Sequence, residues 1–344
     1  METSNNHIWP NILDLIDYLS FPMVEKLQYW EHIPPQLASI FGFTPEGDFV
    51  PYSDNGKFSL LPSGFRAAYF RGQNRYYEKC YPSLFRNRED KDFVIQCLKS
   101  HEFMELLSTH PILKSLKEKG IYINKWALAQ HYCLCTNLMD ITCDIWAAAF
   151  FATTSYNWQT DDYSPIGEDF EDGVGVLYVS KKYSDNLPNI TPLGYNFFPR
   201  PHKQMAFTYS MEKGKNFNDD SLFEKYFFFH DLQASKLIFE MSFRQRKYWS
   251  KDVLADKANE IKRGKSISRK AIDSFEKNSE FNRWSKEEML NFCQEAGYEI
   301  TESPTVVFEQ SYVEKLKADW EQKKDDYFSK STYIPLLKVS DDTD

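Results

Sequence analysis

The sequence predicts an α+β fold with a central mixed or antiparallel sheet, flanking helices and a C-terminal helical extension. Two observations support this class. Segments with strand character are separated by few helical segments and then cluster late, between residues 174 and 243. A doubly wound α/β fold would instead alternate strands and helices throughout. Beyond about Ser242 the chain changes to charged sequence with helical periodicity.

The composition is that of a globular protein with a sizeable core. The chain has 344 residues, of which 42% are hydrophobic and 17% aromatic, and this disfavours a disordered chain. The length suits one large domain or a core domain with an appended unit. We expect an N-terminal helical segment and linker over residues 1–63, a core domain over 64–243 and a mainly helical extension over 244–344.

The first third of the chain predicts helices around a single strand. Residues 8–43 carry an apolar helical face, and the Gly, Pro, Ser and Asp content of residues 44–64 is typical of a loop or linker. Residues 67–70 read as a strand that stops at Arg71. Apolar residues at helical intervals over 91–120 predict helical structure that ends at Gly120.

The middle and the end of the chain predict the remaining elements. Residues 124–151 divide into a helix to about His131, a short strand and a second helix that Thr142 or Asp144 would cap. The acidic segment 160–173 is expected to be a loop. Further strands are expected over 174–179 and 204–209, with one or two more in "KYFFFHDL" and "SKLIFEMSF". A helix is expected over 311–328.

The charge and the cysteine content indicate which partners and which cellular compartment to expect. The formal net charge of −9 gives no general reason to expect a nucleic-acid partner. The basic run from Lys262 to Lys270 nevertheless keeps a nucleic-acid-linked hydrolase as an alternative, although such runs are usually solvated helix faces. Six irregularly spaced cysteines favour a reducing, cytoplasmic setting. No stretch approaches the roughly 18 apolar residues of a membrane span, so we expect no membrane partner.

Common catalytic motifs do not occur in this sequence. It contains no dinucleotide-binding or phosphate-loop glycine motif, no serine-hydrolase elbow and no zincin motif. His131, Cys133, Cys135 and Cys143 could be imagined as zinc ligands. Their spacing is a weak signal, however, and buried cysteines are common, so we expect no metal.

Several polar residues stand beside apolar elements, where packing alone would not require them. They are Arg71, Gly72, Gln73, Arg86, Gln130, His131, Asp140, Thr142, Arg200 and Gln204. A buried arginine needs an anionic or planar polar partner because an unpaired buried charge is costly. Either Arg71 and Asp140 belong to an internal network, or these groups converge on a ligand.

Four motifs in order resemble the FRG domain family, which is named after a Phe-Arg-Gly motif. They are "YFRGQ" with "YPSLFR", then "QHYCLCTNLMDIT", then "DIWAAAFFAT", and last "PRPHKQMAF", and the resemblance covers roughly residues 64–243. The family pattern carries Gly and Pro where this chain has Cys133 and Cys135. It usually carries Arg and Leu where this chain has Asn137 and Met139.

The order of strand, helix and strand over residues 136–180 is also similar to the middle of an ADP-ribosyltransferase. That resemblance implies NAD as cofactor. It also implies Arg71 as the residue that holds NAD, Thr142 or Thr136 as the residue at the strand–helix junction, and Gln204 at the position of the catalytic Glu. By chemistry, Gly72 would let a ligand approach the backbone. Gln73 and Arg200 would complete the binding set.

Gln204 is neutral and cannot act as a base, so another group would have to supply the carboxylate. Asp140 and Glu240 are the candidates, and His131 is an alternative base. The resemblance therefore implies a protein that binds NAD or another nucleotide and transfers ADP-ribose to a macromolecule or hydrolyses NAD. The alternative is a non-catalytic module in which the same polar residues form a structural network and the flanking helices bind a partner protein.

Overall fold

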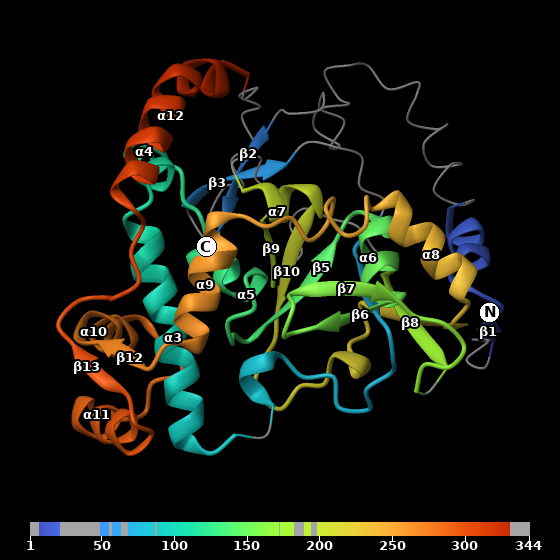
Figure 1. The fold of residues 1–344 in the computed structure, drawn as a ribbon, viewed down its shortest axis with the longest axis horizontal. Helices are drawn as coiled ribbons and strands as arrows, with labels where there is room; N and C mark the ends of the chain where they lie inside the picture. The colour runs from blue at the N-terminus through green and yellow to red at the C-terminus, as the bar shows by residue number, and fades with distance from the viewer. Residues whose placement is uncertain are drawn as a thin grey trace, which may run out of the picture. The chain divides into compact units, whose positions relative to one another are not determined.

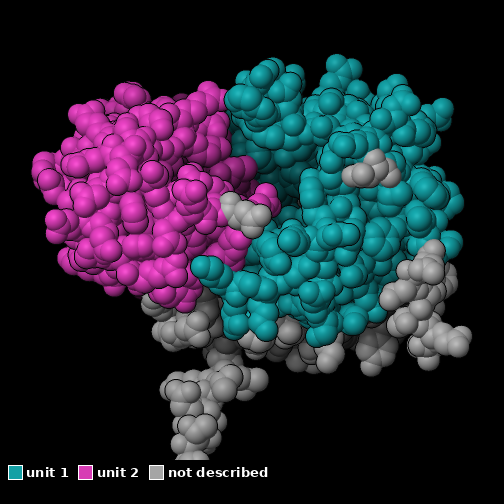
Figure 2. Space-filling view, turned by 90° about the horizontal axis from the view of Figure 1, so that it is seen from below, with its two compact units in different colours: residues 1–38, 65–82, 138–252 teal, residues 39–64, 83–137, 253–344 magenta. Residues whose placement is uncertain are grey.

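The chain forms two compact units, which Figure 2 colours separately. The computed structural model describes residues 7–20, 49–54, 57–62, 68–86, 88–171, 173–181, 189–193 and 198–330. Unit 1 comprises Met1–Ala38, Phe65–Pro82 and Leu138–Asp252, and unit 2 comprises Ser39–Gly64, Ser83–Asn137 and Val253–Asp344. Each unit is assembled from three stretches of sequence, whereas the expected domains follow one another along the chain.

Unit 1 contains a seven-stranded mixed sheet in the order β1-β11-β8-β4-β5-β10-β9 (Figure 1). Every neighbouring pair is antiparallel except β1 and β11, which are parallel. The predicted α+β class with a mixed sheet is therefore confirmed. The strands are β1 (Ile8–Trp9), β4 (Phe70–Gln73), β5 (Leu138–Thr142), β8 (Val174–Ser180), β9 (Ile190–Pro192), β10 (Ala206–Ser210) and β11 (Phe223–Phe229).

One face of this sheet carries the apolar core of unit 1. Three helical segments pack on this face: residues 12–20, α6 (Ile145–Ala152) and α8 (Leu232–Met241). They contact the strand residues Phe70, Leu177 and Phe228 in one apolar cluster. Of the two expected caps of α6, Asp144 is the one used, since its side chain accepts from the N–H of Trp146 at 2.9 Å. The alanines of α6 are small, so this helix can approach the sheet closely.

Two sequence predictions in unit 1 are wrong. The segment "SKLIFEMSF" lies largely in α8 and not in a strand, because Asp231 caps a helix there and the buried Ala234 and Ile238 recur four residues apart. The acidic segment 160–173, expected to be a loop, contains the strand β7 (Asp162–Pro165), which forms a hairpin with the preceding strand β6 (Thr154–Asn157).

Unit 2 is built around the long helix α3 (Asp90–Ser108), whose apolar side chains pack with those of the later helices. The expected C-terminal helices are present, including the one predicted over 311–328. The other helices of unit 2 are α4 (Pro111–Glu118), α5 (Lys125–His131), α9 (Val253–Arg263), α10 (Arg269–Asn278), α11 (Lys286–Glu295) and α12 (Gln310–Lys330).

Unit 2 also contains two pairs of strands that the sequence did not indicate. β12 (Ser266–Ser268) and β13 (Glu299–Thr301) are parallel, and β2 (Phe49–Asp54) and β3 (Lys57–Pro62) form an antiparallel pair. The second pair lies in the segment expected to be a loop, where the strand-forming residues Val50, Tyr52 and Leu60 outweigh its glycines and prolines. No helix in the described ranges has the length and apolar character needed to span a membrane.

Gly72 is the residue of β4 at which α6 makes its closest approach. A Cβ atom at this position would overlap the main-chain carbonyl of Ala148, which cannot move without disturbing the helix. We predict that Gly72→Ala lowers the free energy of unfolding by about 3 kcal/mol, because overpacking forces the sheet and the helix apart.

Urea denaturation of the purified chain measures this effect. Gly214→Ala is the control, since nothing lies within 4 Å of its Cβ position and only its φ of +85° is unfavourable. The control should cost roughly 1 kcal/mol. If both variants lose the same free energy of unfolding, the contact with α6 is not the reason that residue 72 must be glycine, and the prediction is wrong.

His101 of α3 is buried in unit 2, with its ring beside those of Trp126 and Phe275 and its Nδ1 3.1 Å from the hydroxyl of Ser274. Burial lowers its pKa from the ordinary 6.5 to about 4. In the unfolded chain His101 is protonated below about pH 6.5, whereas in the folded chain it stays neutral until about pH 4. Stability must fall as the pH drops through this window.

We predict that His101→Asn reduces the loss of unfolding free energy between pH 7 and pH 5 by about 2 kcal/mol. Asn can keep a hydrogen bond to Ser274 and does not titrate. Burial also lowers the pKa of His110 to about 4. In the His101→Asn variant, His110 should therefore still cause part of the fall in unfolding free energy between pH 7 and pH 5. The measurement is urea denaturation at both pH values, and an unchanged difference would contradict the prediction.

Candidate functional site

Arg71, Gly72 and Gln73 lie inside the sheet. The strand β4 does not stop at Phe70 as expected, because its last three residues pair with Tyr178, Leu177 and Val176 of β8, respectively. The ladder to β8 thus carries the polar residues into the middle of the sheet. A prediction from hydrophobicity alone misses this continuation because the cation breaks the apolar run.

On its other side β4 pairs with β5 at a single position. Phe70 is opposite Thr142, and no further pair follows among the described residues of these two strands. The guanidinium of Arg71 reaches across instead, and its Nη1 donates to the main-chain carbonyl of Asp140 at 2.7 Å. Arg71 therefore links β4 to β5 where the main-chain ladder has ended.

The side chains of Arg71 and Asp140 belong to opposite faces of the sheet. Phe70 and Thr142 are a cross-strand pair and share a face, and side chains alternate along each strand. Asp140 therefore shares the α6 face with Thr142, whereas Arg71 and Gln73 lie on the other face. The contact that the sequence suggested between Arg71 and Asp140 exists, but the acceptor is a peptide carbonyl and not the carboxylate.

Arg71 is half-buried, and not all of its N–H groups donate hydrogen bonds within the described structure. No carboxylate among the described residues lies within ion-pairing distance of its guanidinium. Its Nε is buried and donates to no atom of the described structure. A buried guanidinium that lacks an anion is energetically unfavourable, so this face of the sheet favours binding of a negatively charged group.

Four further side chains complete what we call the β4 cluster: Gln73, Cys80, Tyr178 and Asn218. The amide of Gln73 lies 3.4 Å from the thiol of Cys80, and the hydroxyl of Tyr178 donates to Asn218 at 2.7 Å. Burial raises the pKa of Tyr178, with Arg71 acting weakly in the opposite direction. Tyr178 therefore stays protonated at neutral pH, and Arg71 is the one cation of the cluster.

Sequence reasoning missed Cys80, Tyr178 and Asn218 as members of this cluster. Tyr178 lies in a segment whose pattern predicts a buried apolar strand, and in the sequence only its hydroxyl indicates another role. Asn218 is far from β4 in sequence and follows no strand. It is brought to the cluster by its own amide, which donates to the carbonyls of Tyr77 and Glu78 at 2.7 and 3.1 Å.

Three other expected binding residues, Thr142, Gln204 and Arg200, bond to main-chain carbonyls of unit 1. The hydroxyl of Thr142 donates to the carbonyl of Gln204 at 2.5 Å and accepts from the N–H of Asp144. The amide of Gln204 donates to the carbonyl of Tyr248 at 2.7 Å. Arg200 lies 3.9 Å above the ring of Trp249 and donates from Nε to a carbonyl. These residues are grouped in unit 1 but have internal partners.

The two remaining catalytic candidates are not part of the β4 cluster. Glu240 lies on an exposed position of α8, where it forms an ion pair with Arg244 at 3.1 Å. His131 belongs to unit 2, at the buried end of α5 with its ring next to that of Tyr132. Within the described residues, no three His, Cys, Asp or Glu side chains are grouped as metal ligands would be.

The basic run of unit 2 is divided among three elements. Lys262 and Arg263 end α9, Lys265 precedes β12, and Arg269 begins α10. Arg269 forms an ion pair with Glu302 at 3.0 Å, and the ammonium of Lys265 lies 4.5 Å from the centre of the Tyr298 ring. These cations do not lie along one continuous helix face, as a basic binding stripe would require.

Comparison with protein families gives one match. Residues 66–161 match the model of the FRG domain, a range that includes β4, β5 and α6. Searches of curated proteins and of solved structures returned no match. The matched range contains Phe70-Arg71-Gly72, the tripeptide that gives the domain its name, at the centre of the unit 1 sheet. The chain therefore contains an FRG domain.

Proposed function

We propose that this protein binds NAD or a related nucleotide through the β4 cluster, with Arg71 contacting a phosphate group. The observation that carries the proposal is the half-buried guanidinium, whose buried Nε has no acceptor among the described residues. A phosphate offers several acceptor oxygens and a charge that offsets the cation. Arginine also suits such a site because its planar donor array can make paired hydrogen bonds with phosphate.

The other members of the β4 cluster fit a sugar or base. Amide–thiol contacts such as the one between Gln73 and Cys80 are weak, so the Gln73 amide can exchange this partner for a ribose hydroxyl at little cost. The hydroxyl of Tyr178 gives its one proton to Asn218, and its oxygen can still accept from a ribose hydroxyl. A bound NAD would supply an activated glycosidic bond to nicotinamide, and the residues of this chain would bind and orient the molecule.

We further propose that unit 1 has an ADP-ribosyltransferase-like core. The order of strand, helix and strand in β5, α6 and β8 supports this. Transfer or hydrolysis would also need a carboxylate close to the ribose. Asp140 belongs to the opposite face from Arg71, Glu240 is exposed, and Gln204 is an amide bound to main chain, so nucleotide binding is the step that these residues favour.

The second candidate is a non-catalytic module, and one observation favours it. Gly72, Thr142, Arg200 and Gln204 all have structural explanations within unit 1. In this interpretation Arg71 acts only as the link between β4 and β5.

Thermal unfolding in the presence of NAD, ADP-ribose and ATP tests the proposal. A ligand that binds only the folded chain stabilises it by about 2.7 kcal/mol at a hundred times its Kd. We therefore expect NAD or ADP-ribose to raise the unfolding temperature. We expect Arg71→Met, which keeps most of the apolar stem, to lower the affinity at least tenfold, whereas Arg244→Met in the turn after α8 should not change it.

The outcomes separate the two candidates. If no nucleotide raises the unfolding temperature of the unmodified chain, the binding proposal is wrong. If an Arg71→Met or Arg71→Lys variant folds and binds nucleotide as tightly as the unmodified chain, Arg71 is only a structural link. Release of nicotinamide from NAD, measured on the same samples, distinguishes binding alone from transfer or hydrolysis.

A further inference from the structure

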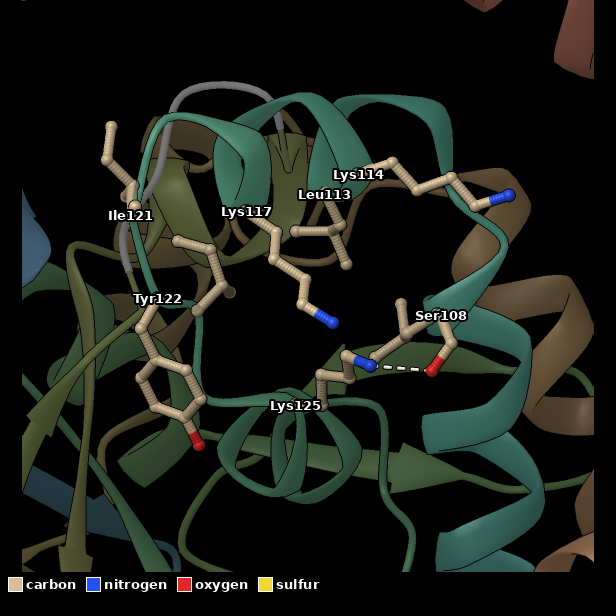
Figure 3. Close-up of a pocket in the computed structure, with 10 residues that line it drawn as sticks. Ser108, Leu113, Lys114, Lys117, Ile121, Tyr122 and Lys125 are labelled. Carbon is tan, nitrogen blue, oxygen red and sulfur yellow. Dashed lines mark hydrogen bonds between the residues drawn. The ribbon is translucent and has the colours of Figure 1, made fainter. Parts of the chain in front are cut away.

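Unit 2 contains a cavity of about 660 Å³ that is independent of the β4 cluster. Its walls come from the end of α3, from α4, from the loop that follows α4, and from the start of α5 (Figure 3). Pockets of this size accommodate small organic ligands. Leu107, Leu113 and Ile123 form apolar wall and are themselves buried, so the cavity belongs to the packed body of the unit.

Two ammonium groups face this apolar cavity. Figure 3 shows the side chains of Lys117 and Lys125 extending towards its centre, whereas that of Lys114 extends away from it. The ammonium of Lys125 lies 2.5 Å from the hydroxyl oxygen of Ser108. Because that hydroxyl gives its proton to the carbonyl of Met104 at 2.8 Å, its oxygen is left to accept from Lys125. This geometry fixes the position of one cation in the wall.

Neither lysine has an anionic partner in the described part of unit 2. No carboxylate lies within ion-pairing distance of either ammonium. Lys125 is half-buried, and burial lowers its pKa; the charge of Glu105 opposes this shift, and the charge of Lys117 adds to it. Two like charges beside an apolar wall repel each other. A ligand anion between them would remove this repulsion.

The helix dipole offers a simpler explanation for the position of Lys117 but not for that of Lys125. Lys117 lies in the last turn of α4, where a cation interacts favourably with the carbonyl end of the helix. That effect does not require the side chain to extend into the cavity, and it does not apply to Lys125, which begins α5. A structural role for Lys117 therefore leaves the placement of Lys125 beside apolar residues unexplained.

We infer that this cavity binds a small amphipathic anion, with a carboxylate or phosphate head between Lys117 and Lys125 and an apolar body against Leu107, Leu113 and Ile123. The ammonium of Lys125 has two N–H groups beyond the one directed at Ser108, and these are available to an anionic oxygen. The apolar walls add a contribution that depends on the length of the ligand chain.

Isothermal titration calorimetry on the full chain tests this inference with four probes below their micellar concentrations. Octanoate and octyl phosphate carry both features of the ligand, octanol lacks the charge, and inorganic phosphate lacks the apolar body. We expect one of the two amphipathic anions to bind at least tenfold more tightly than both octanol and inorganic phosphate. The stronger of the two identifies the preferred head group.

Three variants locate the site. Lys117→Gln and Lys125→Gln should each weaken binding of the amphipathic anion about tenfold, whereas Lys114→Gln should leave it unchanged. Lys117 is exposed, so its variant should fold, which circular dichroism can verify. The inference is overturned if octanol binds as well as the anions, if none of the probes binds, or if all three variants weaken binding equally.

Discussion

The close packing of β4 against α6 at Gly72 is the constraint on which the candidate site depends. Only a residue without a side chain allows the carbonyl of Ala148 to lie against this strand. Once Gly72 faces the helix, alternation places Phe70 on the same side and Arg71 on the other. The Phe-Arg-Gly tripeptide therefore combines three functions: an apolar contact with the core, a cation on the opposite face and a contact between strand and helix.

The same constraint separates residues that the sequence places together. Asp140 was the natural internal partner for Arg71, yet strand pairing assigns their side chains to opposite faces. Arg71 bonds to the peptide carbonyl of Asp140, which satisfies one donor but leaves the charge without a counterion among the described residues. A neutral acceptor cannot offset a cation as a carboxylate does. The positive charge of Arg71 is therefore not neutralised. For this reason we propose nucleotide binding rather than a purely internal hydrogen-bond network.

Both proposed sites use cations that have no carboxylate within ion-pairing distance in the part of the chain that the structure describes, but they differ in how the cation is held. In unit 1 a single guanidinium lies in the middle of a sheet, among groups that donate or accept hydrogen bonds. In unit 2 two ammonium groups face an apolar cavity, and one of them is fixed by Ser108. The first environment suits a polar, phosphate-bearing molecule. The second suits a molecule with one charged end, because its apolar walls cannot satisfy further polar groups.

The α+β class, most of the helices and the central strands could be predicted from the sequence, because they depend on local periodicity and on caps such as Asp144. The FRG resemblance was likewise contained in short motifs, and the family match confirms it. Local patterns were insufficient for α8, where a capping aspartate and a buried face outweighed an apolar run. They also failed for the hairpins of β2 with β3 and β6 with β7, which lie in segments that resemble loops.

The contacts between polar groups depend on the three-dimensional fold. Strand order and register brought Tyr178 and Asn218 to Arg71 and turned Asp140 away, and neither register nor order can be read from a single strand. Packing likewise decided that Thr142 and Gln204 bond to main chain. The sequence by itself determined which chemical groups were present and which elements carried them. Their partners depended on pairing between distant segments, because a cross-strand contact is set by two strands together.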